Sequence, residues 1–158
     1  VLALKPDLQL KDLRGNVPTR IEKLRKGEYD AILLAKAGVN RLGLDLGDLI
    51  QINLSPAEFV PAPSQGVLGY QIRTDDVNLS LLLRNLNNEK IENEIKVERK
   101  VLQLMNGGCQ LPLGVYFDGK FVYVSYAPSS LSAARYFKFE YSNEIKFAEN
   151  IVAHLKNF

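Results

Sequence analysis

The chain has 158 residues, 46% of them apolar and 24% charged, which is typical of a globular protein. Its 20 basic and 18 acidic residues give a net charge of only +2, and no basic stripe with interleaved aromatic residues occurs, so nucleic-acid binding is not expected. No apolar run reaches the roughly 18 residues of a membrane span. One cysteine and one histidine make neither an internal disulfide nor a metal cluster. A reducing, cytoplasmic setting is expected.

The first 75 residues predict strands alternating with helices. Three segments have the apolar pattern of strands, at 8–13, 30–35 and 49–54. One helix is predicted to begin at Val17, capped by Asn16, and to end at Gly27. A second helix is predicted over 36–42 and is closed by Gly43. This order indicates an α/β domain with a parallel sheet, whose ligands bind near the carboxyl ends of the strands.

Several cationic side chains lie around the first predicted helix. Arg14 precedes the helix and Arg20 lies in its first turns, where free N–H groups and the positive end of the helix dipole favour anions. Lys23, Arg25 and Lys26 are interpreted as an ordinary solvated face. For Arg14 and Arg20, the residues alone support an anion site and a solvated face equally.

The segment 60–73 is rich in proline and glycine and ends in a short predicted strand. It is a crossing between domains, or a backbone that closely approaches a ligand, or an ordinary proline-rich loop followed by an edge strand. The composition becomes helical near 74–76, which predicts a domain boundary there.

Residues 76–158 predict a small α+β domain in which helices cover a three-stranded antiparallel sheet. Its helices are expected from Asp75-Asp76 to Leu86, over 90–105, and after a Ser142 cap with Ile145 in its buried stripe. Its strands are expected at 113–117, 120–126 and 134–141, the first two joined through Asp118-Gly119. The aromatic residues Phe117, Phe121 and Tyr123 are assigned to the core.

The single cysteine, Cys109, follows Gly107-Gly108 directly. Most free cysteines are small, buried and inert, and that interpretation is open here. The alternative is that the two glycines, which can adopt positive φ, allow the backbone to turn sharply. The thiol would then be exposed to a large ligand.

Ordered motifs run along nearly the whole chain: Leu13-Arg14-Gly15-Asn16-Val17 with Thr19-Arg20, Gly27-Glu28-Tyr29-Asp30-Ala31-Ile32, Ala37-Gly38 with Arg41-Leu42-Gly43, Pro61-Ala62-Pro63 with Gln65-Gly66 and Gly69, Glu98-Arg99, and Gly107-Gly108-Cys109-Gln110 with Pro112. Together they closely resemble the porphobilinogen deaminase (hydroxymethylbilane synthase) family.

The resemblance implies a three-domain enzyme of tetrapyrrole and heme biosynthesis whose first two domains are similar to type II periplasmic binding proteins. Such an enzyme is a transferase that joins four porphobilinogen molecules head to tail and releases ammonia. The chain grows on a dipyrromethane primer, held by a thioether to a cysteine. The resemblance also implies a cytoplasmic protein that is a monomer at full length.

By the same resemblance, Cys109 is the covalent attachment point of the dipyrromethane. Arg14, Arg20 and Arg41 are implied to hold the acetate and propionate groups of the primer and of the growing polypyrrole chain. The other implied cofactor-binding residues are Thr19, Leu34, Ala35, Gln65 and Gly66. No metal is implied.

The resemblance assigns residues 1–75 to the remaining part of the second domain with the strand that crosses to the first, and 76–158 to the C-terminal domain. The sequence departs from the family at Ser64, where glycine is common. The family's catalytic aspartate is expected upstream of Val1, so no acid/base residue is assigned here, and the isolated chain is expected to lack turnover.

Two alternatives remain on the residues themselves. One is a non-catalytic α/β anion-binding module in which Cys109 is structural. The weaker one is a thiol enzyme, which is disfavoured because the only histidine, His154, falls on the last predicted helix and no Cys–His pair is indicated.

Overall fold

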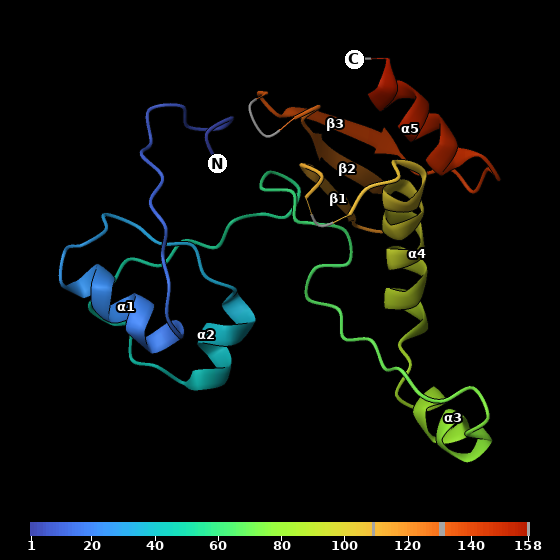
Figure 1. Ribbon diagram of the computed structural model, residues 1–158, viewed down its shortest axis with the longest axis horizontal. Coiled ribbons are helices and arrows are strands. Elements are labelled where there is room, and N and C mark those ends of the chain that lie inside the picture. The colour runs from blue at the N-terminus through green and yellow to red at the C-terminus, as the bar shows by residue number, and fades with distance from the viewer. Residues whose placement is uncertain (109, 130–131, 158) are drawn as a thin grey trace. The chain divides into compact units, whose positions relative to one another are not determined.

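A computed structural model describes residues 1–108, 110–129 and 132–157. Its elements, shown in Figure 1, are α1 (Val17–Arg25), α2 (Lys36–Leu42), α3 (Val77–Arg84), α4 (Glu89–Leu104), β1 (Leu113–Phe117), β2 (Phe121–Tyr126), β3 (Arg135–Glu140) and α5 (Phe147–Lys156). Internal contacts divide the chain into two units, Leu4–Leu54 with Leu2, and Ser55–Phe158 with Val1 and Ala3. No helix of the described ranges is long and apolar enough to cross a membrane.

Both helices of the first unit begin and end where the sequence predicts. The Asn16 side chain caps α1 by accepting a hydrogen bond from the Thr19 amide at 2.9 Å, which satisfies one of the free N–H groups of the first turn. Ile21 is the buried residue of this helix. Gly43 ends α2 in the left-handed conformation, with φ 57°.

The three strands predicted in the first unit do not form among the described residues, since 8–13, 30–35 and 49–54 have no strand pairing. The side chains of Ile50 and Ile52 are 94% and 79% exposed. An apolar run shows only that a segment favours burial. A strand also needs a neighbouring strand for its backbone N–H and C=O groups, and no such partner pairs with these segments here.

The second unit contains the predicted antiparallel sheet, with strand order β1-β2-β3. Val124 of β2 pairs with Val115 of β1 and with Phe137 of β3. At the connection between β1 and β2, Gly119 has φ 93° and the Asp118 carboxylate accepts hydrogen bonds from the next backbone amides. This arrangement confirms the predicted hairpin.

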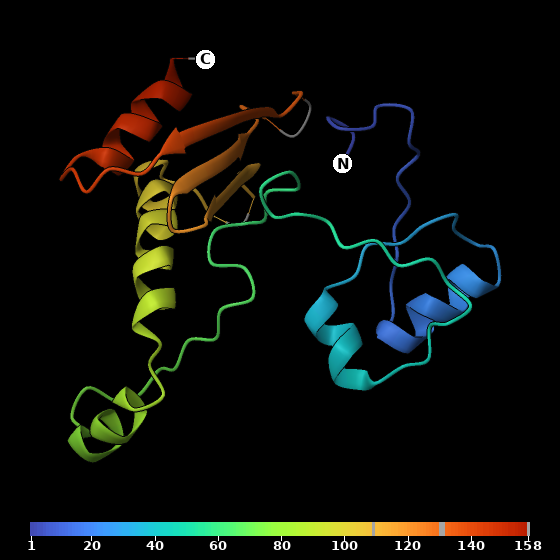
Figure 2. The same cartoon turned by 180° about the vertical axis from the view of Figure 1, so that it is seen from behind.

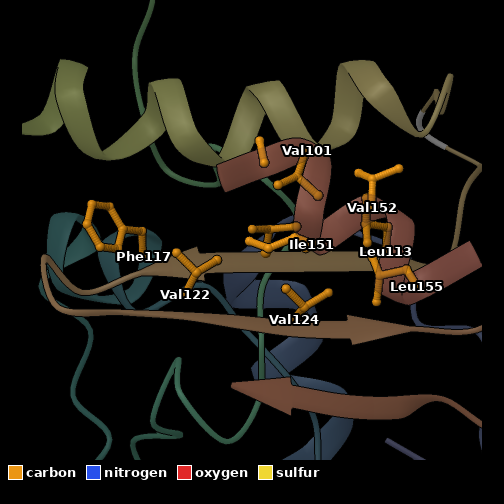
Figure 3. Packing of buried hydrophobic residues seen from close by; sticks show 10 residues of the cluster. Val101, Leu113, Phe117, Val122, Val124, Ile151, Val152 and Leu155 are labelled. Atoms are coloured by element: carbon orange, nitrogen blue, oxygen red, sulfur yellow. The ribbon is translucent and has the colours of Figure 1, made fainter. Parts of the chain in front are cut away.

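Helices α4 and α5 cover one face of the sheet (Figure 1). Figure 3 shows the apolar side chains that fill the space between these layers. They are Val101 from α4, Leu113, Val115, Phe117, Val122 and Val124 from the sheet, and Ala148, Ile151, Val152 and Leu155 from α5. This cluster is the core of the unit, and its burial supplies the main stabilising term.

The opposite face of the sheet carries aromatic and cationic side chains. Tyr116 and Tyr123 stack with ring centroids 6.1 Å apart, and the Lys138 ammonium lies 3.8 Å from the centroid of the Phe121 ring. The assignment of Phe121 and Tyr123 to the core was therefore wrong, while that of Phe117 was right. Side chains alternate between the two faces of a strand, so Phe121 and Tyr123 lie on the face opposite to that of their core-facing neighbours.

Two helices of this unit differ from expectation in detail. Asp76 caps α3, whose leucines are mostly exposed, and Figure 2 shows this helix at the end of α4 that is remote from the sheet. Ser142 does not cap α5, because that helix begins only at Phe147. Ile145 consequently lies outside the helix and is 98% exposed.

The outer edge of β1 is closed by groups from outside the sheet. The Val115 amide donates to the Pro61 carbonyl at 2.9 Å, and the Phe117 amide donates to Glu98 Oε1 at 3.0 Å. Such pairing protects an edge strand, whose N–H groups would otherwise be open to another chain. The segment around Pro61 is thus packed on the sheet within the second unit, while the predicted domain boundary near residue 75 stays a prediction.

Gly114 allows the close approach of this segment. A Cβ atom at Gly114 would lie 2.7 Å from the Val60 carbonyl oxygen and 3.0 Å from that of Pro61. We expect Gly114→Val to lower the free energy of unfolding by about 1–3 kcal/mol, the usual cost of overpacking. Urea denaturation measures this cost. Gly69→Val is the matched control, because nothing lies within 4 Å of its added Cβ; equal losses in both variants would contradict the packing argument.

Candidate functional site

The loop before α1 is folded onto the start of that helix. Arg20 Nε donates to the Gly15 carbonyl at 2.7 Å, and Lys23 Nζ donates to the Arg14 carbonyl at 3.2 Å. Gly15 has φ 120°, and the space of its missing side chain is occupied by Thr19, whose Cγ2 would lie 2.9 Å from a Cβ there. The positions of Arg14, Thr19 and Arg20 are therefore fixed by the backbone of one short loop.

Arg25 differs from the other arginines of this unit because it already has anionic partners. Its Nε and Nη2 bind the two carboxylate oxygens of Asp48, each at 2.8 Å, and its Nη1 binds Glu22. The hydrogen bond from Arg25 lowers the pKa of the Asp48 carboxyl below its usual value. Among the residues that the structure describes, no carboxylate pairs with Arg14 or Arg41. Both remain available to an external anion.

The remaining candidate residues of this unit flank α2. Leu34 and Ala35 precede the helix, and Arg41 lies in its last turn. The Ala35 carbonyl accepts hydrogen bonds from the amides of Gly38 and Val39. Val17 of α1 contacts the position of Gly38 in α2, where an added Cβ would be 3.8 Å from its Cγ2. The structure thus brings the start of α1 and the first turn of α2 together.

Gln65 and Gly66 belong to a turn of the second unit. Ser64 and Gly66 both have left-handed backbones, with φ 61° and 81°. The Ser64 amide donates to Glu98 Oε2 at 2.7 Å, so this turn is bound to α4. The left-handed conformation costs a serine more than a glycine, and it accounts for the glycine that the family commonly has here.

Cys109 lies outside the described residues, and its neighbours define only the approach to it. Asn106, after the end of α4, has φ 51°, whereas neither Gly107 nor Gly108 is left-handed. A Cβ at Gly107 would overlap the side chain of Leu111, while nothing lies within 4 Å of one at Gly108. The sharp turn therefore depends on Asn106, and the first glycine is required by packing.

Glu98 is a functional candidate whose role the sequence analysis did not identify. It is only 6% exposed and accepts hydrogen bonds from two backbone amides. Burial raises the pKa of its carboxyl, and the two hydrogen bonds offset part of that effect. The sequence signal was a charged residue, one turn before Val101, on the apolar face of a helix. Within the described ranges, no group of three or more histidine, aspartate or glutamate side chains could hold a metal ion.

Residues 1–80, just over half of the chain, match the family model described as porphobilinogen deaminase, dipyromethane cofactor binding domain. This chain belongs to the porphobilinogen deaminase family. The predicted resemblance is confirmed, and a dipyrromethane cofactor is confirmed as the ligand class of the matched domain. The match ends before Cys109, so the attachment point stays a prediction.

Similar proteins include the porphobilinogen deaminases of Roseiflexus sp. (strain RS-1), with 49% identity over 114 residues, and of Bacillus mycoides (strain KBAB4), with 44% identity over 116 residues. That of Staphylococcus carnosus (strain TM300) is 43% identical over 116 residues. The matched regions cover 71–73% of this chain but only 36–37% of these relatives. The matched stretch of the chain thus spans little more than a third of the length of these relatives.

Asn16 caps α1 next to the loop that carries Arg14, and this capping can be tested directly. We expect Asn16→Ala to lower the free energy of unfolding by about 1 kcal/mol, because the hydrogen bond from the Thr19 amide is lost. Asn16→Asp keeps a side-chain acceptor at the cap and should be nearly neutral. Chemical denaturation compares the two variants; a loss as large for aspartate as for alanine would rule out the capping explanation.

Proposed function

We propose that the complete protein is a porphobilinogen deaminase, a cytoplasmic, monomeric transferase that joins four porphobilinogen molecules into hydroxymethylbilane and releases ammonia. The observation that carries this proposal is the match of residues 1–80 to the cofactor-binding domain of that family. The arginine loop at the start of α1 supports it, because its chemistry suits an acidic ligand.

The ligand and the arginines are chemically complementary. Each pyrrole unit carries two carboxylates, so a chain of several units needs several permanently charged groups with a planar donor fork. Arg20 is oriented by its bond to the Gly15 carbonyl, and Arg14 and Arg41 have no carboxylate partner within the described part of the chain. Thr19, Leu34, Ala35, Gln65 and Gly66 complete the proposed cofactor-binding surface.

Cys109 is proposed to hold the dipyrromethane through a thioether. The chain reaches it from α4 through Gly108, and nothing lies within 4 Å of a Cβ atom added at Gly108. A thiol that carries a bulky substituent has to be accessible. When bound, the dipyrromethane supplies the free pyrrole end to which new units are added. No acid or base for that addition is assigned within these 158 residues. We therefore expect the chain alone to be inactive.

The first unit is proposed to complete a sheet in the whole enzyme. The segments 8–13, 30–35 and 49–54 combine a strand-like apolar pattern with exposed side chains such as Ile50 and Ile52. In a domain similar to a type II periplasmic binding protein, neighbouring strands would pair with them and bury these side chains. We place the boundary to the C-terminal domain at residues 75–76.

Intact-mass measurement of the full-length protein tests the proposed function. We expect an adduct of two pyrrole units, located on the peptide that contains Cys109. Cys109→Ser should lose the adduct, because the hydroxyl is a far weaker nucleophile than the thiolate. Bare mass in the unaltered protein would instead support a non-catalytic anion-binding module. A normal adduct in Cys109→Ser would remove this cysteine from the mechanism.

Turnover measurements test the arginines. In the full-length protein, Arg14→Leu or Arg20→Leu should lower kcat/KM for porphobilinogen about tenfold or more, because a lost charged hydrogen-bond partner costs roughly 1.5–3 kcal/mol. Lys26→Leu is the control, since Lys26 is an exposed cation at the far end of the same helix. Unchanged turnover in both arginine variants would refute their binding role.

A further inference from the structure

Glu98 joins three segments that are far apart in the sequence. Its own helix, α4, carries it into the interior, where it is 6% exposed. Oε2 accepts from the amide of Ser64, 34 residues earlier, at 2.7 Å, and Oε1 accepts from the amide of Phe117, 19 residues later, at 3.0 Å. Each oxygen therefore serves a different segment.

A buried carboxylate is an unfavourable way to fill a core. Removing its charge from water is costly unless hydrogen bonds compensate, and an apolar side chain of similar volume usually stabilises a fold at least as well. The two backbone amides supply that compensation here. They also specify where the two segments lie, which an apolar side chain would not do.

The segment held through Ser64 is under local strain. Ser64 has φ 61° although it is not a glycine, and its hydroxyl oxygen is buried without a hydrogen-bond partner among the described residues. Neither its backbone preference nor its side chain stabilises this conformation. Two backbone hydrogen bonds close the turn, from the Gln65 amide to the Ala62 carbonyl at 3.1 Å and from the Val67 amide to the Ser64 carbonyl at 3.2 Å, and the bond to Glu98 is the contact that attaches this turn to α4. Gln65 and Gly66 follow directly, and their orientation depends on it.

The same helix leads to the cysteine loop. One turn after Glu98, Val101 is fully buried in the core, and α4 ends at Leu104, followed by the left-handed Asn106 and the tightly packed Gly107. The segment with Gln65 and Gly66 and the segment leading to Cys109 are thus attached to one rigid element.

We propose that Glu98 is a positioning residue, which holds the Gln65–Gly66 turn in register with the helix that carries the cofactor-attachment loop. This inference rests on the proposed function, because it takes Gln65 and Gly66 to contact the polypyrrole chain. Glu98 itself contacts backbone amides and takes no part in bond formation.

Glu98→Gln in the full-length protein separates this role from simple packing. The amide has nearly the same shape but only one acceptor oxygen, so one of the two backbone amides loses its partner. We expect kcat to fall about tenfold or more, because one hydrogen bond to a charged group is lost. KM for porphobilinogen should stay within about twofold, because the arginines are unchanged. Amide hydrogen exchange at residues 64–66 should become several-fold faster.

Each rate is divided by the amount of folded protein that carries the two-pyrrole adduct, and the fraction with the adduct is measured by intact mass. Glu94→Gln is the matched control, one turn earlier on α4, where the carboxylate pairs only weakly with Lys90 at 3.9 Å. Unchanged kcat and exchange in Glu98→Gln, or an equal loss in Glu94→Gln, overturns the proposal. An unaltered protein without adduct overturns the proposed function instead.

A second variant pair covers the case in which Glu98→Gln folds poorly. Ser64→Gly adopts positive φ without strain and removes the unpartnered hydroxyl, so it should support folding of the double variant. We expect Glu98→Gln/Ser64→Gly to have lower kcat and faster exchange at residues 64–66 than Ser64→Gly alone. Equal values in these two proteins overturn the positioning role.

Discussion

One buried carboxylate determines how the second unit is assembled. The sheet has an open edge at β1, and the segment around Pro61 and Ser64 has no regular structure of its own. Glu98 accepts one hydrogen bond from a backbone amide of β1 and one from the Ser64 amide. The Pro61 carbonyl accepts a hydrogen bond from a further amide of β1. An irregular segment is thereby attached to a well-packed core, which is how a loop can carry binding residues with precision.

In the first unit, the main feature is the placement of the cationic side chains. A short capped helix supplies free amides at its start, and the loop before it is ordered by hydrogen bonds to its own carbonyl groups. Arg25 is neutralised by Asp48 and Glu22, so it serves the structure. Arg14, Arg20 and Arg41 have no carboxylate partner among the described residues, and we propose that they bind an acidic ligand.

Local chemistry allowed much of the fold to be predicted. Asn16, Gly43 and the Asp118-Gly119 turn each fix a backbone conformation within a few residues, so α1, α2 and the hairpin were found correctly. The strands predicted at 8–13, 30–35 and 49–54 do not form among the described residues, because a strand depends on a partner elsewhere in the chain, which a local apolar pattern does not reveal. Phe121 was misplaced because aromatic character does not reveal which face of a strand it occupies.

The candidate site was predicted largely from ordered motifs, and Glu98 shows the limit of that approach. Its neighbour in the motif, Arg99, is exposed, whereas Glu98 is buried, and its place on the apolar face of the helix indicates this burial but not its partners. Its partners are backbone amides, which every residue type offers, so no pairing pattern indicates Ser64 or Phe117. Only the folded arrangement shows that a carboxylate is needed at this position.

The central claim is that guanidinium groups of this chain neutralise the acidic side groups of a pyrrole cofactor attached to Cys109. A crystal structure of the complete, cofactor-bearing protein tests it most directly. The account predicts that carboxylates of the dipyrromethane lie within hydrogen-bonding distance of Arg14, Arg20 and Arg41. Carboxylates that contact only solvent, or that are held entirely by residues outside this chain, would contradict it.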